Sequence, residues 1–365
     1  MLLYIHVPFC ARRCTYCDFA IAVRRAVPSE AFAADVEAEW RLRQADPWWN
    51  ESPGVETIYY GGGTPSHVAP RALGRILEVV RADRTVATSA EITIETNPDD
   101  VTDWNADLWR EVGINRVSLG VQSFDPRVLA WMHRTHTTDQ VPAAVEMLRR
   151  AGFANISIDL IYGLPESLER DWSADLDSAL ALAPEHLSLY ALTVESGTPL
   201  GKWTTRGSVQ PLQDDRVAAE YLQANARLRE SGFEHYEVSN AARPGFRAVH
   251  NAGYWERAPF IGLGPSAHSG VGRERRWNLR EYESWRRTVV AGSDPTDGAE
   301  SLNDDQLLLE QRYLGLRTDR GVPKELVPEA NRSTWLAEGW AESSGDRIRL
   351  TLEGWLRLDA LVATL

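Results

Sequence analysis

Cysteine is nearly absent from this chain. Only three of its 365 residues are cysteines, and all three fall within positions 10–17. So few thiols in so long a chain cannot form the disulfide framework that stabilises small secreted domains. The sequence therefore predicts a reducing compartment, and we expect a cytoplasm of the bacterial type, where these cysteines stay available as thiolates.

Long apolar runs and an excess of positive charge are also missing. No run of about 18 apolar residues occurs, so no transmembrane helix is expected. The first ten residues, MLLYIHVPFC, lack the basic and long apolar segments of a signal peptide. The chain carries 39 basic and 52 acidic residues, a net charge of -13. This balance argues against a nucleic-acid partner that is bound through a general positive field.

The first part of the chain contains a regular alternation of strand-like and helix-like segments. β-Branched and aromatic residues mark strand-like runs over 2–9, 56–63, 91–98, 116–124, 155–165 and 186–197. Helical spacing of apolar residues predicts helices from Ser29, the expected N-cap, and over 70–82, 103–112, 138–151 and 168–182. Strands separated by helices predict parallel βα units. Right-handed crossovers would curl these units into a sheet or a partial barrel.

Each strand-like run ends in a polar or glycine-rich segment. In parallel βα architectures, the carboxyl ends of the strands build the functional site. We therefore expect residues from successive strand ends to face one mouth. These residues are Cys10, Gly62, Glu95, Gln122 and Asp159.

The alternation weakens after about residue 205. A helix is predicted over 213–231, with Gly232 after it, then one strand over 235–240 and an apolar, glycine-punctuated loop over 260–270. The last stretch, 300–365, predicts two helices, a hairpin and a final helix, the order of a small winged-helix-like domain. Acidic residues around the hairpin favour a structural or partner-docking role over DNA binding. The predicted domains are 1–205, 206–295 and 296–365.

The cysteines are spaced C-x3-C-x2-C, which limits what they can hold. A structural zinc site usually takes four ligands, often as two C-x2-C pairs; here the second pair is missing, although His6 has the spacing of a fourth ligand. Unrelated buried cysteines are usually scattered. Iron-sulfur clusters favour Cys thiolates, and three thiolates leave one iron of a four-iron cluster without a protein ligand. Because the segment directly follows the first strand-like run, a functional site is favoured over a structural one.

The spacing of Cys10, Cys14, Tyr16 and Cys17, followed in order by YYGGGTPS and ETNP, resembles the radical SAM superfamily. This resemblance implies a partial (β/α)6 barrel in which the thiolates hold a four-iron, four-sulfur (4Fe-4S) cluster. The amino and carboxylate groups of S-adenosylmethionine (SAM) would chelate the fourth iron. Electron transfer to the sulfonium would give a 5'-deoxyadenosyl radical, which a closed barrel mouth would shield from water.

The same resemblance implies SAM-binding residues at the strand ends. Alone, GGGTP (61–65) would be a strand-ending turn, and without a following Gly-Lys-Ser/Thr it is no P-loop. The resemblance assigns its backbone to the methionine end of SAM and Arg134 to the carboxylate. It assigns Asp159 and Gln122 to the ribose hydroxyls, and aromatic or apolar side chains to adenine. The implied residues are Tyr4, Tyr16, Gly61, Gly62, Gly63, Thr64, Glu95, Gln122, Arg134, Asp159 and Ile161.

Segments along the whole chain are similar to the oxygen-independent coproporphyrinogen III oxidases and their relatives. They include IHVPFC, RVSLGVQSF, DLIYGLP, HLSLYALTVESGTPL, YEVSN and GLGPSAHS. The true oxidases keep a further cysteine where this chain has Phe19, and they have several dozen residues before the cluster where this chain has nine. Both departures argue against oxidase activity. The segment HNAGYW instead matches the mark of the haem chaperone (HemW) branch.

HNAGYW supplies the candidates for haem binding, which are His250, Asn251, Tyr254 and Trp255. Imidazole is a common axial ligand of haem iron, and aromatic faces pack against a porphyrin. A lone histidine is more often a satisfied core or surface residue, so the motif carries this assignment. His235 and His268 are nearby rivals for the ligand.

The resemblance implies a haem chaperone that binds haem and hands it to client haemoproteins such as respiratory-chain proteins. It further implies a reductase or flavodoxin-type electron donor, a cytoplasmic protein in peripheral contact with the inner face of the membrane, and a homodimer. Two alternatives stay open: an oxygen-independent coproporphyrinogen III oxidase that converts propionates to vinyls, and a zinc-stabilised barrel that binds partners. The sequence does not decide whether SAM is cleaved, and so whether the protein is an enzyme.

Overall fold

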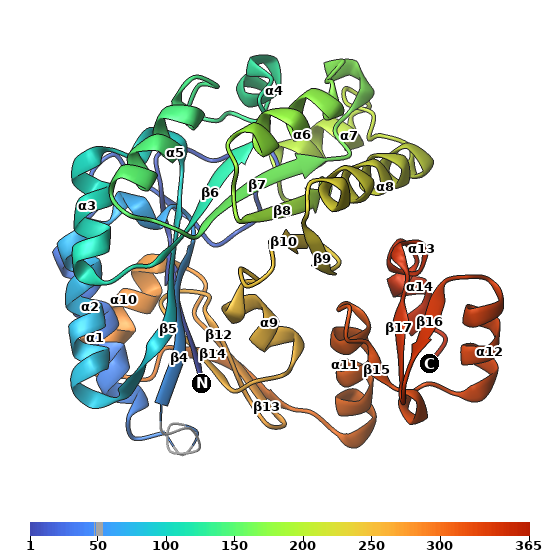
Figure 1. Ribbon diagram of the computed structural model, residues 1–365. Helices are drawn as coiled ribbons and strands as arrows, with labels where there is room; N and C mark the ends of the chain where they lie inside the picture. The colour runs from blue at the N-terminus through green and yellow to red at the C-terminus, as the bar shows by residue number, and fades with distance from the viewer. Residues whose placement is uncertain (47, 49–53) are drawn as a thin grey trace.

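One twelve-stranded sheet organises the chain, in the order β14-β13-β12-β11-β1-β4-β5-β6-β7-β8-β10-β9. The computed structural model describes residues 1–46, 48 and 54–365. The strands from β1 to β8 in this order pair in parallel and form its centre. They are β1 (Leu2–Val7), β4 (Gly54–Gly62), β5 (Thr85–Thr96), β6 (Arg116–Gln122), β7 (Ile156–Tyr162) and β8 (His186–Ala191). Every strand-like run is therefore confirmed, and Figure 1 shows the curved partial barrel that the strands form.

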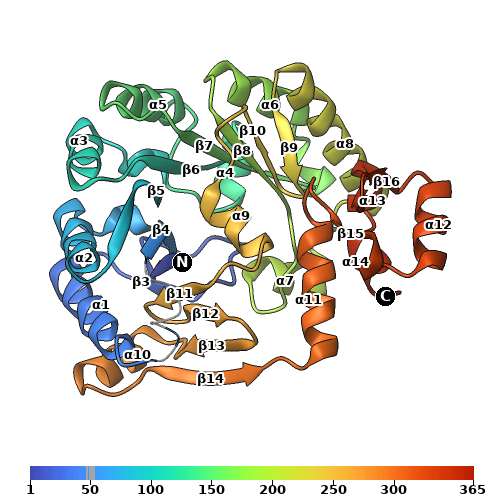
Figure 2. The same ribbon diagram turned by 60° about the horizontal axis from the view of Figure 1, so that its bottom comes forward.

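Helices cover the outer, convex face of this sheet (Figure 2). They are α1 (Ser29–Arg43), α2 (Pro70–Asp83), α3 (Asp103–Val112), α5 (Gln140–Arg150) and α6 (Trp172–Ala181). The predicted βα alternation is confirmed. The helix predicted over 168–182 was too long, because Glu166–Leu168 forms a separate 3-10 turn and α6 begins after its N-cap, Asp171.

The apolar patterns explain how strands and helices pack. β1 is buried at Leu2, Leu3, Ile5 and Val7, a near-continuous apolar run typical of a parallel strand covered on both faces. Ser29 does not cap α1 as expected: its hydroxyl accepts a hydrogen bond from the Ala69 N–H (3.0 Å). The serine thus ties the start of α1 to the start of α2. In α2 the buried residues are Pro70, Ala72, Leu73, Gly74, Ile76, Leu77 and Val80.

Four strands extend the sheet beyond β1. β11 (Phe260–Leu263) pairs with β1 in parallel, and β12 (His268–Val271), β13 (Glu274–Asn278) and β14 (Thr296–Ser301) follow in antiparallel order. The prediction of a loop over 260–270 was therefore wrong. Two four-residue strands give only a short sequence signal. Glycine at position 262 lets β11 and β12 approach closely, because a Cβ there would clash with the His268 carbonyl oxygen.

The other edge of the sheet is a short antiparallel pair. β10 (Asn240–Ala242) pairs with β8 and with β9 (Glu234–Glu237). The single strand predicted over 235–240 is thus two strands. The chain reverses between them because the Glu237 carboxylate accepts hydrogen bonds from the Ser239 N–H and the Asn240 side-chain amide.

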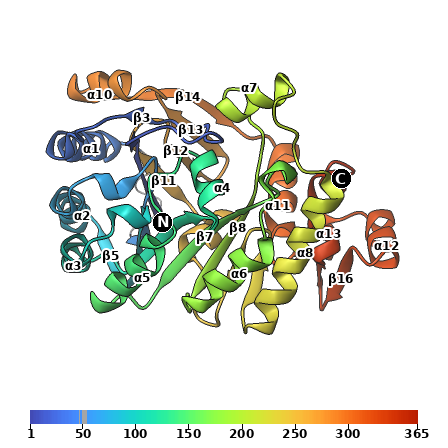
Figure 3. The same cartoon turned by 90° about the horizontal axis from the view of Figure 1, so that it is seen from above.

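The remaining helices of the large unit lie around the sheet. They are α4 (Pro126–Trp131), α7 (Pro199–Thr205), α8 (Asp214–Glu230), α9 (Val249–Trp255) and α10 (Tyr282–Val290). α8 confirms the helix predicted over 213–231, and Gly232 follows it at φ 82°. Figure 3, seen from above Figure 1, shows α4 inside the ring of outer helices and α7 beside it. Among residues 1–46, 48 and 54–365, no helix is both long and apolar enough to cross a membrane.

The end of the chain forms a small three-stranded sheet with helices around it (Figure 1). Its strands are β15 (Val322–Pro323), β16 (Ala341–Ser344) and β17 (Arg347–Leu350), and its helices are α11 (Asp304–Leu316), α12 (Glu329–Ala337), α13 (Leu352–Trp355) and α14 (Leu358–Val362). The two helices and the hairpin of the predicted winged-helix-like order are confirmed, with β16–β17 as the wing. The single helix predicted after the hairpin is two short helices, α13 and α14, and β15 was not predicted. Since β14 belongs to the large sheet, Thr296–Ser301 groups with the preceding part, and the domain boundaries stay a prediction.

A buried carboxylate joins α1 to the added strands. Glu39 is fully buried, and it accepts hydrogen bonds from the Gly264 N–H (2.8 Å) and the Trp285 indole N–H (2.9 Å). It also accepts from the Asn278 amide (2.6 Å) and pairs with the Arg43 guanidinium (3.3 Å). Burial raises the pKa of Glu39, and these donors favour its charged form. One side chain thus holds the turn after β11, the strand β13 and the helix α10 against α1.

Substitution of this carboxylate should destabilise the protein strongly. Glu39→Ala should lower the free energy of unfolding by about 3–5 kcal/mol, because it leaves several buried donors without an acceptor. Urea unfolding followed by far-ultraviolet circular dichroism measures the change. Glu146→Ala is the matched control: it removes an exposed pair with Arg150 and should change the free energy of unfolding by about 0.5 kcal/mol or less. Equal effects of the two substitutions would contradict the role of Glu39.

Candidate functional site

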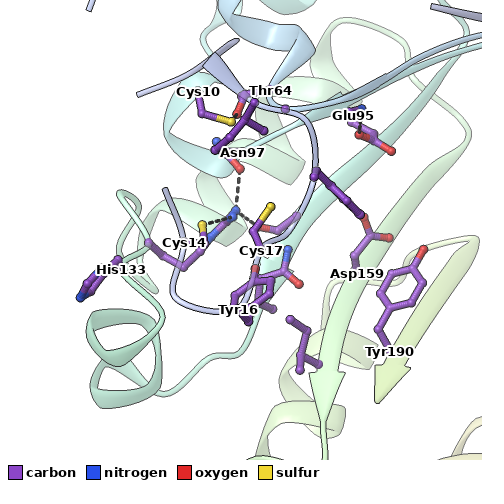
Figure 4. Close-up of a pocket in the computed structure, with 18 of the residues that line it drawn as sticks. Cys10, Cys14, Tyr16, Cys17, Thr64, Glu95, Asn97, His133, Asp159 and Tyr190 are labelled. Atoms are coloured by element: carbon purple, nitrogen blue, oxygen red, sulfur yellow. Dashed lines mark hydrogen bonds between the residues drawn. The ribbon is translucent and has the colours of Figure 1, made fainter. Parts of the chain in front are cut away.

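The three cysteines lie on the loop that follows β1. Cys10 is buried, and Cys14 and Cys17 are half-buried. Cys10 ends the short strand β2 (Phe9–Cys10), which pairs in parallel with β3 (Ala22–Val23). Figure 4 shows the cysteine side chains on one side of a pocket, with Asp159 and Tyr190 on the opposite side.

Backbone hydrogen bonds fix the middle of this loop. The Thr15 N–H donates to the Met132 carbonyl (3.3 Å), and the Leu200 N–H donates to the Thr15 carbonyl (2.9 Å). Met132 follows α4 and Leu200 belongs to α7, so two segments far along the chain hold the cysteine loop. The positions of Cys14 and Cys17 therefore depend on the packing of these two segments and not on the loop alone.

The cysteines line a cavity of about 490 Å³, which we call the cysteine cavity. Its walls come from the carboxyl ends of β4 to β8, as the strand-end argument predicted. Its volume lies in the range of pockets that hold small molecules and cofactors. The predicted residues that line it are Cys10, Cys14, Tyr16, Cys17, Gly62, Gly63, Thr64, Glu95, Gln122, Arg134, Asp159 and Ile161.

Tyr4 and Gly61 are the predicted SAM contacts that do not line the cysteine cavity. The Tyr4 hydroxyl forms a hydrogen bond with His6 Nδ1 (3.1 Å), and its ring stacks on Tyr59 with 6.1 Å between centroids. A Cβ on Gly61 would lie 2.8 Å from the Tyr59 ring and 2.9 Å from the Tyr4 ring. Neighbouring residues of a strand point to opposite faces, so Gly61 and Gly62 do not share a role. Gly61 makes room for aromatic rings.

Polar groups lie against two of the sulfur atoms. The Thr64 hydroxyl donates to Cys10 Sγ (3.6 Å), and the Arg134 guanidinium donates to Cys14 Sγ (3.7 Å). Burial raises the pKa of Cys10 to about 11, so without a metal this thiol is protonated at neutral pH. Metal coordination deprotonates a thiol. The loop thus offers three sulfur ligands, with a cation and a hydroxyl donor placed to stabilise negative charge on them.

Arg134 is fixed at the wall of the cysteine cavity. Its Nη2 donates to Asn97 Oδ1 (2.5 Å) and to the Gly120 carbonyl (2.6 Å). A Cβ on Gly120 would lie 3.2 Å from the guanidinium, so glycine leaves room for it. Arg134 Nε is buried without a hydrogen-bond partner in the described part of the chain. A guanidinium held in this way is suited to an anionic ligand such as a carboxylate.

Glu95 shapes the glycine turn at the end of β4. Its carboxylate accepts hydrogen bonds from the Tyr59 hydroxyl (2.8 Å) and the Gly62 N–H (3.0 Å). Gly62 adopts φ 112°, which favours glycine, and a Cβ there would lie 2.6 Å from the His6 ring. Burial raises the pKa of Glu95 to about 7. The Glu95 carboxyl therefore holds the backbone of Gly62 in the conformation that lines the cysteine cavity.

Gln122 and Asp159 end neighbouring strands. Gln122 lies at φ 69°, and the pairing of β6 with β7 shifts in register between Gly120 and Gln122. Such a bulge redirects a side chain at a strand end. The Asp159 carboxylate accepts hydrogen bonds from the hydroxyls of Ser118 (3.0 Å) and Ser157 (3.3 Å), and burial raises its pKa. The two serines orient a carboxylate that can accept from ligand hydroxyls.

Sequence reasoning missed several residues of the cysteine cavity. Asn97 and Tyr190 follow or end strands, so the strand-end argument that found Glu95 could have found them too. His133 follows α4 and is exposed, and no pattern in the sequence indicates its place. The missed residues include Asn97, Ser118, His133, Tyr190 and Glu195.

The cysteine loop fits an iron-sulfur cluster better than a zinc ion. His6, the candidate fourth zinc ligand, has both ring nitrogens engaged: Nδ1 with the Tyr4 hydroxyl and Nε2 with the Ala20 carbonyl (2.9 Å). Burial lowers the pKa of His6 to about 4. Three thiols on one loop match the ligands of a 4Fe-4S cluster with one iron open to another molecule.

Comparisons with known proteins place the chain in a family. The radical SAM superfamily matches residues 4–179. The haem chaperone HemW of Mycobacterium tuberculosis is 37% identical over 369 residues, which cover 100% of this chain and 94% of that protein. The haem chaperone HemW of Synechocystis sp. is 36% identical over 336 residues, which cover 90% of this chain and 81% of that protein. The chain belongs to the HemW family of radical SAM proteins.

One solved structure shares the fold of this HemW family member. The coproporphyrinogen III oxidase (HemN) from Escherichia coli, a radical SAM enzyme, has a TM-score of 0.80 and 21% identity to this chain. The similarity covers 99% of this chain and 89% of that one. The central barrel, the added strands and the C-terminal unit thus form an arrangement that a solved structure shares. Membership of the radical SAM superfamily implies a 4Fe-4S cluster and SAM binding.

The histidine of the HNxxYW segment is buried in this HemW family member. His250 is 1% exposed; its Nδ1 forms a hydrogen bond with the Thr57 hydroxyl (2.7 Å) and its Nε2 with the Tyr254 hydroxyl (3.0 Å). Burial lowers its pKa to about 3. The structure therefore does not present His250 as a free haem ligand, because neither ring nitrogen is left to bind iron.

The rest of the segment joins α9 to its neighbours. The Glu91 carboxylate accepts hydrogen bonds from the N–H groups of Val249 and His250 (both 3.0 Å) at the start of the helix. The Arg317 guanidinium, at the end of α11, lies 4.6 Å from the Trp255 ring. Asn251 is half-buried. The segment thus links the large sheet to the C-terminal unit.

The raised pKa of Glu95 predicts a pH dependence of stability. Between about pH 4.5 and pH 7 the folded state keeps a proton that the unfolded state releases, so this carboxyl lowers stability as pH rises through that window. Glu95→Gln should remove the effect. The free energy of unfolding of the variant, relative to wild type, should increase by about 1–3 kcal/mol from pH 5 to pH 8 in urea titrations. A difference that does not change with pH would contradict the raised pKa.

Proposed function

We propose that the protein is a haem chaperone that binds haem and delivers it to client haemoproteins, with a SAM-coordinated 4Fe-4S cluster. The observation that carries this proposal is the 37% identity to the haem chaperone HemW of Mycobacterium tuberculosis along the whole chain. The cysteine cavity supports it, because the three cysteines share that cavity with polar residues from successive strand ends.

In this proposal Cys10, Cys14 and Cys17 hold three irons of the cluster. When bound, the cluster and SAM supply one-electron chemistry at the SAM sulfonium. The protein contributes a shielded site and fixed charges: Cys10 is buried, Thr64 donates to its sulfur, and Arg134 donates to Cys14. These donors stabilise the charge that three thiolates bring into a partly buried place.

Other residues of the cysteine cavity would bind SAM by its parts. Arg134 would take the carboxylate, and the backbone of Gly62 and Gly63 would lie along the methionine end. Asp159 and Gln122 would meet the ribose hydroxyls. Adenine would pack on the apolar side, where Ile161 belongs to a small buried cluster against which Tyr16 packs. The cavity therefore has a charged wall for the methionine end of SAM, polar groups for the ribose and an apolar wall for adenine.

Phe19 argues against the oxidase alternative. The oxidases that the chain resembles keep a cysteine at this position, and the shared fold with HemN concerns the arrangement of the backbone alone. Phe19 is 60% exposed and lines the cysteine cavity. We therefore propose transfer of intact haem and not decarboxylation of porphyrinogen propionates.

The proposal requires partners. They are client haemoproteins such as respiratory-chain proteins, and a reductase or flavodoxin-type protein that reduces the cluster. We also propose that the protein is cytoplasmic and contacts the inner face of the membrane peripherally. It would act as a homodimer.

Haem transfer and porphyrinogen oxidation can be separated in one experiment. The protein is reconstituted anaerobically with iron and sulfide, and one portion is titrated with haem and mixed with an apo-haemoprotein. Another portion is incubated with SAM, a reductant and coproporphyrinogen III. We expect haem binding, haem transfer and no protoporphyrinogen. Formation of protoporphyrinogen would refute the chaperone function, and bound zinc with no cluster would support the zinc-stabilised alternative.

Loss of one thiol should abolish the cluster without unfolding the barrel. Cys14→Ser should remove the visible absorption of the 4Fe-4S cluster and its bound iron after reconstitution, while far-ultraviolet circular dichroism and thermal unfolding of the apo-protein stay as in wild type. The core carries most of the stability, and Cys14 is only half-buried. Ala11→Ser, which adds a hydroxyl to the same loop, should keep the cluster. A cluster retained in Cys14→Ser would contradict the ligand assignment.

A further inference from the structure

A second cavity adjoins the cysteine cavity. It has a volume of about 540 Å³, and we call it the His268 cavity. The two cavities meet at a common wall, made by Asp18, Phe19, Gly62 and Glu95. The other residues that line the His268 cavity are Tyr4, His6, Ala20, Tyr254, Phe260, Ser266, His268 and Arg280.

His268 presents a free imidazole to this cavity. It is exposed at the start of β12, and in the described part of the chain neither of its ring nitrogens has a hydrogen-bond partner. The ring stacks on Trp277, with 5.9 Å between centroids and 28° between planes, which fixes its orientation. Desolvation lowers the pKa of His268, so the ring is neutral at physiological pH, the form that binds iron.

The rival histidines are engaged or lie elsewhere. His6 and His250 have both ring nitrogens in hydrogen bonds. His235 pairs Nε2 with the Val238 carbonyl, and its Nδ1 is buried. His133 is exposed, but it lines the cysteine cavity, where SAM is proposed to bind. The remaining three are bonded to other groups: His67, His136 and His186.

The walls of the His268 cavity suit a flat apolar molecule that carries carboxylates. Phe19 is 60% exposed, and the rings of Tyr254 and Phe260 pack edge to face with 4.9 Å between centroids. Arg280 is exposed at the rim and donates one bond to the Asp18 carbonyl (2.6 Å). A guanidinium has five N–H donors, so others can reach an anion. Haem combines an aromatic plane, an iron that binds imidazole, and two propionates.

We propose that haem binds in the His268 cavity, with His268 as an axial ligand of the iron and Arg280 paired with a propionate. This inference rests on the proposed haem-chaperone function and names the site that the function uses. Phe19 then packs against the porphyrin at the wall shared with the cysteine cavity. His250 is a positioning residue, because its Nε2 forms a hydrogen bond with the hydroxyl of Tyr254, which lines the cavity.

A haem titration of the full-length protein tests the iron ligand. Ferric haem is added to wild type and to His268→Gly, and the visible and electron paramagnetic resonance spectra are recorded. Wild type should give the spectra of a histidine-ligated haem. His268→Gly should lose them and bind haem roughly tenfold more weakly or worse, and added free imidazole should restore them. His133→Ala removes the exposed histidine of the neighbouring cavity and should keep the spectra of a histidine-ligated haem.

A second variant tests the pairing of Arg280 with a haem propionate. Arg280→Gln should weaken the binding of haem, while the binding of haem dimethyl ester, whose propionates are uncharged, should be the same in the variant and in wild type. An equal loss for both ligands would overturn the pairing of Arg280 with a propionate.

The outcomes separate the site from the function. If wild type binds haem and His268→Gly keeps its histidine-ligated spectra, the His268 site is wrong and the chaperone function stands. If wild type binds no haem at all, the proposed function and this site fall together. If His133→Ala loses the spectra of a histidine-ligated haem and His268→Gly keeps them, the haem binds in the cysteine cavity and the His268 site is wrong.

Discussion

The parallel pairing of β1 with both β4 and β11 positions both cavities of the protein. β1 lies inside a twelve-stranded sheet, with β4 in parallel on one side and β11 in parallel on the other. Strands that run in the same direction end at the same edge, so the cysteine loop, the glycine turn of β4 and the end of β11 meet. The cysteine cavity opens among β4 to β8, and the His268 cavity is lined in part by β11, β12 and the turn between them.

Buried carboxylates hold these strand ends in shape. Glu39 anchors the turn after β11, and Glu95 anchors the turn after β4. Both accept hydrogen bonds from backbone N–H groups, and burial raises the pKa of both. A carboxylate in such a place is stable only while its donors are aligned, so the two cavities depend on the packing of distant segments. Phe19 and Glu95 line both cavities, so only these side chains and their neighbours separate the proposed SAM site from the proposed haem site.

The central barrel and the place of the cysteine loop at its strand ends could be predicted from sequence because their signals are local. Apolar runs marked the parallel strands, and the cysteine spacing marked the loop. The hairpin of β11 and β12 could not be predicted, since each strand has four residues and the close contact at Gly262 exists only after folding. Tyr4 lines the His268 cavity and not the cysteine cavity, and His250 is bonded through both ring nitrogens. A motif names residues, but the strand face and the hydrogen-bond partners decide whether a side chain reaches a cavity or supports its wall.

We propose that this protein holds a cluster and a haem in two cavities that share a wall. This arrangement can be tested by an iron anomalous difference map of crystals of the protein loaded anaerobically with both groups. We expect one iron site beside Cys10, Cys14 and Cys17, and a second beside His268 across Phe19. A second iron site next to His250, or on a surface away from both cavities, would overturn the arrangement.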